Sequence, residues 1–502
     1  MSKRVAVIGA GLGSLATAVR LAGAGWKVDL FERLPGPGGK ANSERVGEYR
    51  FDTGPSLLTM PWVFDALFDS VGKRREDYLE FIPLEIICKY FWDDGMVLRA
   101  YAERERLLAE LRRTTGEPED RVRAYFDRCR KIYDIAGELF LEYNPREPST
   151  IFSRRFFASL LRVGGIDAFR TMDQAHEQAF RSPRLRQLFN RYATYNGSSP
   201  YRTPATLAII PHVEYEGGGY AVRGGIYAIP SALETLAREV GVQLHYETPV
   251  ERILQQPAVG KGRSAGFRVT GIVVGGQQRS YDAVVAGADV RTVYEQLLQD
   301  EEAPDIVRYR KLEPSSSGLV FYWGMKRRFP ELEVNNIFFS RNYPEEFAAI
   351  FDRGQCPADP TIYVNITSKV TPEDAPHGGE NWFVLINAPC DTGQDWEAET
   401  ARVRARILQR LSELFRTDIA AAIEAESVMT PRDIQQKTAS YGGALYGISS
   451  NSRAAAFSRH PNRSRRYRGL YFCGGSTHPG GGMPLVLLSG KITAELMQRY
   501  EQ

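Results

Sequence analysis

The chain has 502 residues, of which 43% are hydrophobic and 25% are charged, and its formal net charge is +3. This composition is ordinary for a globular protein and gives no argument for a nucleic acid partner. The length exceeds what one simple core supports, so two domains are expected. No stretch approaches the roughly 20 apolar residues that a membrane-spanning helix needs.

The five cysteines are far apart and form no C-x-x-C pair, and the six histidines show no metal-ligand spacing. Neither a disulfide framework nor a metal site is therefore expected. Unpaired cysteines favour a reducing, cytoplasmic setting.

The first 33 residues predict a strand, a glycine turn, a helix, a second strand and a terminal acid. Apolar residues 5–8 suit a buried parallel strand. Glycines in the turn allow the backbone to approach a pyrophosphate, which the helix N-terminus then faces. Glu32 lies about 20 residues further on, where an acid can accept hydrogen bonds from a ribose. The sequence thus predicts a dinucleotide site that includes Gly9, Gly11, Gly13, Ser14, Glu32 and Arg33.

Ser14 stands where this motif has its third glycine, and serine is small enough for close packing of helix and strand. The alternative is a secretory signal, because Lys3 and Arg4 precede an apolar run. The turn glycines interrupt that run, which favours the dinucleotide site.

Two further turns follow in the chain. The loop at 35–41 is rich in glycine and proline, and a predicted strand at 49–52 leads into another turn. The backbone can approach a cofactor at both turns. The predicted cofactor site therefore also includes Gly38, Gly39, Lys40, Gly54, Pro55 and Ser56. From about 61 to 200, long helical patterns indicate a second domain that faces the substrate.

The dinucleotide-type pattern returns at residue 217 and again in the tail, where a strand at 469–473 ends in a glycine pair. The expected fold class is therefore α/β, with a discontinuous Rossmann-like domain and an α+β substrate domain. The first comprises 1–75, 217–300 and 431–502, and the second comprises 76–216 and 301–430. Such interruption is more typical of flavoproteins than of nicotinamide dehydrogenases.

The chain resembles the carotenoid desaturase family, of the phytoene desaturase type within the amine oxidase-like superfamily. The resemblance spans essentially the whole chain and is carried by residues 38–40, 51–56 and 473–484, the last similar to the T-H-P-G-x-G-x-P segment of these enzymes. Residues 336–340, and residues 363–369 together with 380–384, resemble the branch that acts on hydroxylated carotenoids.

The resemblance implies FAD, an acyclic carotenoid substrate and formation of a C=C bond, with oxygen or a quinone as the final electron acceptor. It places Val250 at adenine, Gly474 and Gly475 near the ribityl chain, and the isoalloxazine beside Gly482, Met483 and Pro484. Many amine oxidases have arginine at the position of Lys40; lysine keeps the charge but loses the planar fork.

The substrate channel and the catalytic base are less defined. An aromatic tunnel is expected, for which the candidate residues are Phe338, Phe339, Tyr363, Trp382 and Phe383, with core packing as the alternative role. His478 is considered as a base, and a hydrogen bond to a loop is its alternative role. The implied reaction is 3,4-desaturation of a 1-hydroxycarotenoid, with phytoene desaturation and carotene isomerisation also open.

A carotenoid dissolves in lipid, so peripheral binding to a membrane surface is expected. Residues 151–163 alternate bulky apolar and basic residues and fit a surface-binding helix. Outside enzymes, Rab GDP-dissociation inhibitors share this architecture, so a lipid-binding escort protein is the alternative. An amine oxidase is disfavoured, because no aromatic pair that would cage an amine is evident near the tail.

Overall fold

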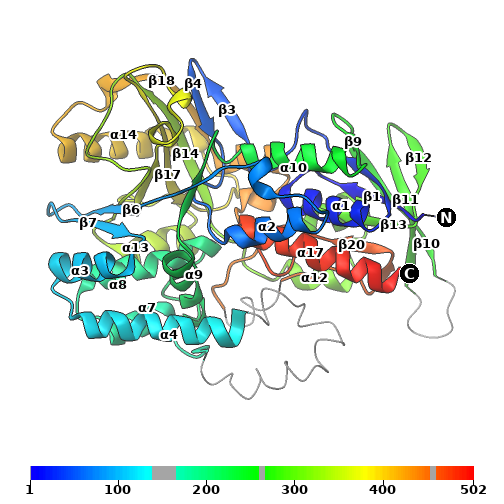
Figure 1. Cartoon of the computed structure of the whole chain (residues 1–502), viewed down its shortest axis with the longest axis horizontal. Helices are drawn as coiled ribbons and strands as arrows, with labels where there is room; N and C mark the ends of the chain where they lie inside the picture. The colour runs from blue at the N-terminus through cyan, green and yellow to red at the C-terminus, as the bar shows by residue number, and fades with distance from the viewer. Residues whose placement is uncertain (1, 138–165, 259–265, 453–458, 502) are drawn as a thin grey trace.

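The computed structural model describes residues 2–137, 166–258, 266–452 and 459–501. Two large sheets lie toward opposite ends of the long axis, and both chain ends lie at the end that holds the parallel sheet (Figure 1). In the described ranges, no helix combines the length and the apolar content needed to cross a membrane. The expected surface-binding helix at 151–163 lies outside the described residues.

A five-stranded parallel sheet is assembled from distant parts of the chain. Its order is β20-β13-β1-β2-β9, and the strands are β1 (Arg4–Ile8), β2 (Lys27–Phe31), β9 (Gln243–His245), β13 (Ala283–Ala286) and β20 (Leu470–Phe472). All four residues of β13 are buried, as expected for a parallel sheet covered on both faces.

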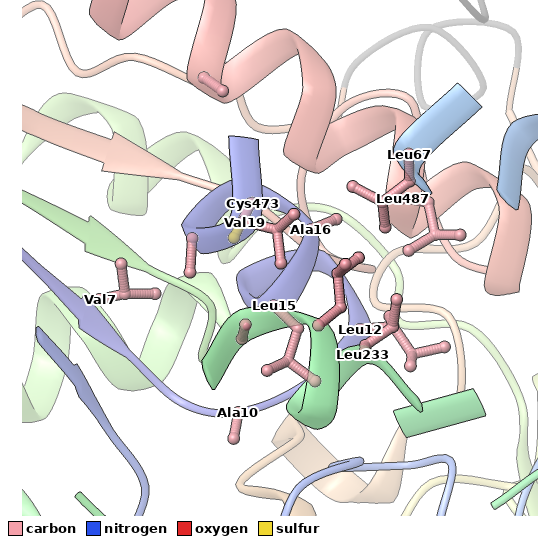
Figure 2. Packing of buried hydrophobic residues seen from close by; sticks show 14 of the residues in the cluster. Val7, Ala10, Leu12, Leu15, Ala16, Val19, Leu67, Leu233, Cys473 and Leu487 are labelled. Carbon is pink, nitrogen blue, oxygen red and sulfur yellow. The ribbon is translucent and has the colours of Figure 1, made fainter. Parts of the chain in front are cut away.

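The pleat of β1 sends alternate side chains to two different cores. Val5 and Val7 face a cluster formed with α1 (Leu12–Gly23), α2 (Pro61–Asp69), α10 (Ala228–Glu239) and α17 (Met483–Tyr500), shown in Figure 2. Ala6 and Ile8 belong to a second cluster with residues of β10 (Val250–Pro257) and β11 (Phe267–Val274). These two strands form an antiparallel sheet with β12 (Gln277–Ser280). The short strand β19 (Tyr467–Arg468) extends that smaller sheet beside β11.

The second large sheet has seven strands in the order β18-β14-β17-β16-β15-β6-β7. Its strands are β6 (Ile86–Phe91), β7 (Val97–Tyr101), β14 (Ser317–Met325), β15 (Asn335–Phe338), β16 (Ile362–Asn365), β17 (Glu380–Ala388) and β18 (Ile423–Met429). Helix α14 (Trp396–Phe415) packs on one face, and its buried Val403, Ile407 and Leu411 join the core there. The other face contributes the wall of a large cavity.

Helices cover the β6–β7 end of this sheet (Figure 1). They are α3 (Arg104–Thr115), α4 (Glu119–Gly137), α7 (Met172–Ala179), α8 (Pro183–Asn190) and α9 (Ile209–Gly217). The shorter elements are the pairs β3 (Ser43–Val46) with β4 (Tyr49–Asp52) and β5 (Phe81–Pro83) with β8 (Tyr220–Val222), and the helices α11 (Val290–Thr292), α12 (Pro304–Tyr309), α13 (Tyr343–Ala348) and α15 (Pro431–Thr438).

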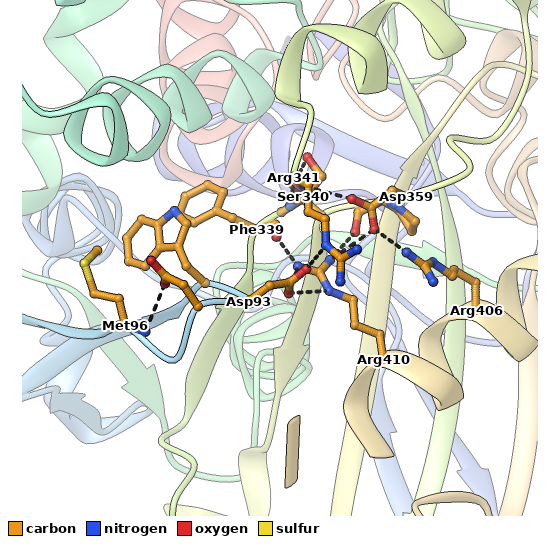
Figure 3. Close-up of polar contacts among 12 residues, drawn as sticks. Asp93, Met96, Phe339, Ser340, Arg341, Asp359, Arg406 and Arg410 are labelled. Atoms are coloured by element: carbon orange, nitrogen blue, oxygen red, sulfur yellow. Dashed lines mark hydrogen bonds and ion pairs between the residues drawn. The ribbon is translucent and has the colours of Figure 1, made fainter. Parts of the chain in front are cut away.

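An ion-pair network joins the turn after β6 to α14 (Figure 3). The Arg410 side chain is 5% exposed and donates to Asp93 Oδ1 from Nε at 3.0 Å and from Nη2 at 2.7 Å. It also donates to the carbonyls of Phe339 and Pro360. Burial raises the pKa of Asp93, but hydrogen bonds from Arg341 and Arg410 outweigh it and lower the pKa. The network therefore holds the segment after β15 in place.

The strands of the two large sheets come from different chain segments, whereas the pair β5–β8 takes one strand from each of the two predicted domains. Residues 1–75, 217–300 and 431–502 contribute every strand of the parallel sheet, and residues 76–216 and 301–430 contribute every strand of the seven-stranded sheet. The exact domain boundaries stay a prediction.

Candidate active site

One cavity of about 1020 Å³ connects the two large sheets, because residues of both line its wall. On the parallel side its lining begins where β1, β2, β13 and β20 end, at Gly9, Glu32, Gly287 and Gly474. Ligands of α/β proteins bind at this carboxyl edge of a parallel sheet. The volume lies at the upper limit of ordinary small-molecule sites, about 300–1,000 Å³.

All eighteen predicted cofactor residues line this one cavity, although they come from distant parts of the sequence. They are Gly9, Gly11, Gly13, Ser14, Glu32, Arg33, Gly38, Gly39, Lys40, Gly54, Pro55, Ser56, Val250, Gly474, Gly475, Gly482, Met483 and Pro484. Their roles toward a cofactor stay predictions, but their spatial convergence is a property of the fold.

The glycine turn after β1 combines an open backbone with close packing. Gly9 has a φ of 91°, a conformation that favours glycine, and Gly38 N–H donates to the Ala10 carbonyl at 2.9 Å. A Cβ on Gly11 would meet nothing within 4 Å, whereas one on Gly13 would stand 3.0 Å from the Val486 carbonyl oxygen. Gly11 therefore leaves space in the cavity, and Gly13 allows α1 to pack on α17.

Two helices begin at the cavity wall without a capping side chain. Helix α1 starts after Gly11 and α17 starts after Gly482, and neither has an acidic residue in its first turn. Free N–H groups and the helix dipole make such ends favourable for anionic groups.

Glu32 is 8% exposed, and its carboxylate accepts hydrogen bonds from Ala10 N–H at 2.7 Å and Leu34 N–H at 2.9 Å. A carboxylate has about four acceptor positions, so it retains capacity for hydroxyl groups in the cavity. The neighbouring Arg33 instead donates to the carbonyls of Gln436 and Lys437, at 2.6 and 2.8 Å. Arg33 thus ties the rim of the cavity to α15.

Lys40 makes contacts that its charge alone did not predict. Its Nζ donates to the carbonyls of Ala444 and Leu445, both at 2.8 Å. Burial lowers the pKa of Lys40 to about 8, although Asp289 opposes this effect. The amine therefore holds the 444–445 segment at the cavity wall with two of its hydrogen bonds, and its role toward a cofactor stays a prediction.

The strand pleat separates the five predicted aromatic residues. Tyr363 and Phe383 point to the cavity, whereas Trp382 and Phe338 belong to the core between the sheet and α14. Phe339 packs against Trp92 at 5.0 Å and Tyr90 at 5.7 Å, in the core beneath the helical layer. Placing Phe338, Phe339 and Trp382 on the channel wall is thus not supported by the structure. Consecutive residues of a strand such as β17 point to opposite faces of the sheet. The sequence could therefore have shown that Trp382 and Phe383 lie on different faces.

His478 does not belong to the cavity lining. Its backbone N–H donates to the His460 carbonyl at 2.9 Å, and its own carbonyl accepts from Asn462 Nδ2 at 2.9 Å. These contacts are made by the backbone and hold the loop in place, so both roles considered for the His478 side chain stay predictions.

Sequence reasoning missed a group of polar residues at the end of the cavity near the seven-stranded sheet. The group consists of Arg191, Tyr195, Asn335, Tyr343, Thr361 and Asn387. Arg191 and Tyr195 lie on one 3-10 helix (Arg191–Asn196), and the others come from β15, α13, β17 and the residue before β16, so no local motif marks them. Asn387 could have been noticed, as a polar residue after the apolar run of β17.

The residues of the parallel side fit FAD. Two uncapped helix ends suit its phosphates, Glu32 has free acceptor positions for a ribose, and a Cβ at Gly11 or Gly482 would occupy open space within the cavity wall.

Comparison with known proteins agrees with this chemistry. Residues 15–498 match the family described as flavin containing amine oxidoreductase. The chain is 41% identical to 1-hydroxycarotenoid 3,4-desaturase of a Flavobacterium species, over 99% of both chains. It is 35% identical to zeta-carotene-forming phytoene desaturase of Myxococcus xanthus, over 99% of this chain and 94% of that one. It is 34% identical to 4,4'-diapolycopene oxygenase of a Methylomonas species, over 98% of each.

Solved structures share the fold at low sequence identity. An oxidoreductase from Methanosarcina mazei superposes with a TM-score of 0.63 at 17% identity, covering 99% of this chain and all of that one. A putrescine oxidase variant gives a TM-score of 0.62 at 15% identity, covering 99% of each chain. The chain belongs to the flavin containing amine oxidoreductase family and, within it, to the carotenoid desaturases, as an oxidoreductase with FAD as its cofactor.

Proposed function

We propose that the protein desaturates an acyclic carotenoid with FAD, and that its reaction is 3,4-desaturation of a 1-hydroxycarotenoid. The observation that carries this proposal is the single cavity, in which a dinucleotide-type end continues into an end walled by apolar strand residues. The relative with 41% identity, named for that activity, supports the finer assignment.

Bound FAD supplies the acceptor for the hydride that leaves the substrate. The chain's own task is then to hold a long hydrocarbon so that one C–C bond reaches the cofactor. Phe383, Leu385 and Val320 offer apolar surface to it, and burial of such surface contributes about 25 cal/mol per Å². The uncapped start of α17 stabilises negative charge on the cofactor side.

The test is incubation of purified protein with FAD and a panel of acyclic carotenoids. Liquid chromatography with absorbance and mass detection should show a red-shifted product that has lost two hydrogens, formed fastest from a 1-hydroxylated substrate. Preferred turnover of phytoene would favour phytoene desaturation, for which the Myxococcus relative is the support. A product of unchanged mass would indicate isomerisation. Purified protein that never retains flavin would favour the lipid escort.

We also propose a cytoplasmic protein that binds peripherally to a membrane surface, because its substrate is delivered from lipid. Residues 151–163 are the candidate contact. Flotation with anionic vesicles should recover the wild type, and the double variant Arg154→Ala with Arg155→Ala should float less. Turnover in sealed anaerobic vials, with and without a quinone, separates the two electron acceptors, oxygen and quinone.

A further inference from the structure

The cavity end near the seven-stranded sheet carries more polar groups than a pure hydrocarbon would require. Five of its lining residues are Arg191, Asn335, Tyr343, Thr361 and Asn387. A polar group buried against hydrocarbon without a hydrogen bond costs free energy, so each group needs a partner in the protein or in the ligand.

Some of these groups are satisfied by the protein. Asn335 Oδ1 accepts from Tyr363 at 2.7 Å and from Asn365 at 2.9 Å, and its Nδ2 donates to the Ile87 carbonyl at 2.9 Å. This amide is therefore a structural support of the wall. The Asn335 amide therefore needs no hydrogen bond from a ligand.

Two donors remain without a partner. Tyr343 is 4% exposed and Arg191 is 7% exposed, and neither Tyr343 OH nor Arg191 Nε has a hydrogen-bond partner within the described ranges. The rest of the guanidinium is engaged, because Nη1 donates to Tyr195 OH at 3.4 Å and Nη2 donates to Tyr90 OH at 2.7 Å and to Glu214 at 3.5 Å. Both unpartnered donors belong to residues of the cavity wall.

The Tyr343 hydroxyl has a fixed position. Its ring stands nearly perpendicular to Phe339, at 5.8 Å, and to Phe347, at 5.0 Å, so packing on both sides holds it. The network around Arg410 holds the Phe339 carbonyl in turn (Figure 3). Burial raises the pKa of Tyr343 well above its usual range, and the nearby Glu346 raises it further. The phenol therefore stays protonated and acts as a donor.

We infer that this end of the cavity binds a hydroxyl group of the substrate, with Tyr343 OH and Arg191 Nε–H donating to its oxygen. An alcohol oxygen has two lone pairs, so it accepts from both donors. The inference rests on the proposed function and adds residues that select an oxygenated carotenoid over the parent hydrocarbon. Held at one point, the hydroxyl also fixes which C–C bond of the chain reaches the cofactor.

The test compares two substrates that differ only in that hydroxyl, a 1-hydroxylated acyclic carotenoid and its parent hydrocarbon. An unpaired buried donor disfavours binding by about 1–3 kcal/mol, so the wild type should prefer the hydroxylated substrate by roughly 5- to 150-fold in kcat/KM. In Tyr343→Phe, which keeps the ring contacts, kcat/KM should fall more for the hydroxylated substrate than for the hydrocarbon, so that most of the preference is lost. The new double bond should also appear at more than one position.

Tyr309→Phe is the matched control, because it removes the hydroxyl of a buried tyrosine that likewise lacks a partner among the described residues but lies outside the cavity lining. It should keep the wild-type preference. Flavin absorbance and Tm verify that both variants are folded holoproteins. Equal loss for both substrates in Tyr343→Phe, or a wild type without preference, would overturn the inference.

Equilibrium binding of the two carotenoids to the holoprotein separates this inference from the proposed function. If the wild type converts neither substrate, desaturation of these carotenoids is refuted. The ratio of the two Kd values still decides whether a hydroxyl is recognised, since equal values would contradict the site and a tenfold difference lost in Tyr343→Phe would support it.

Discussion

Replacing Gly11 with alanine separates the folding role of the glycine turn from its role in cofactor binding. Gly11 has φ −70° and ψ 164°, an extended conformation that alanine adopts without strain. Its Cβ would meet no atom within 4 Å. The apoprotein should therefore keep its stability or gain about 0.4–1 kcal/mol, because the unfolded chain loses freedom.

The same methyl group should weaken FAD binding, because Gly11 lines the cavity at the start of α1, where the phosphates are expected. Insertion of one extra carbon into a close contact costs about 1–3 kcal/mol. That corresponds to roughly 5- to 150-fold in Kd. Titration of apoprotein with FAD, followed by flavin fluorescence or calorimetry, measures this loss, and scanning calorimetry of the apoprotein measures stability.

Gly13→Ala provides the contrast. Its Cβ would stand 3.0 Å from the Val486 carbonyl oxygen and 3.1 Å from the Gly474 backbone, so the apoprotein itself should lose stability. The reasoning is refuted if Gly11→Ala binds FAD with the wild-type Kd, or if it lowers the Tm of the apoprotein as much as Gly13→Ala does.

Four further substitutions test contacts in the structure. Asp93→Ala leaves the buried Arg410 guanidinium with Asp359, 3.8 Å away, as its remaining carboxylate, and urea unfolding should show a loss of about 1–3 kcal/mol; an unchanged unfolding free energy would contradict the network. Trp382→Ala should cost about 3–5 kcal/mol of stability with little change in KM for a carotenoid, whereas Phe383→Leu should raise that KM with a smaller stability loss. Because burial lowers the pKa of Lys40 to about 8 from 10.5, the unfolded chain binds more protons between these values. Unfolding free energy should therefore rise with pH across this window relative to Lys40→Met, and a flat difference between about pH 7 and about pH 10 would contradict the assignment.

Local sequence was sufficient for the dinucleotide-type end of the cavity. The strand, turn, helix and acid between residues 5 and 32 are adjacent in the chain, and their geometry follows from short-range rules for glycine turns and parallel strands. The glycine pair Gly474 and Gly475 was recognised in the same way, as a strand that ends in a turn before a helix. The resemblance to a known family then indicated that the N-terminal segment and the glycine pair lie together at the cofactor.

Side-chain direction was harder to predict. Trp382 and Phe383 are neighbours with similar chemistry, yet one lies in the core and the other on the cavity wall, because the pleat alternates. Reading the aromatic content of β17 without its alternation therefore placed Trp382 wrongly. The position of Phe339, just after β15, depends instead on the rings of Tyr90 and Trp92 from a distant strand pair.

The contacts of Lys40, Arg191 and Tyr343 could not be predicted from the local sequence pattern. The type of each side chain is evident from the sequence, but whether it finds a hydrogen-bond partner depends on segments up to several hundred residues away, as with Lys40 and the carbonyls of Ala444 and Leu445. The chain alone thus specifies where strands, turns and helices form, because those depend on neighbours in sequence. Which polar groups are left without a partner inside the cavity depends on long-range packing, and only the folded molecule reveals it.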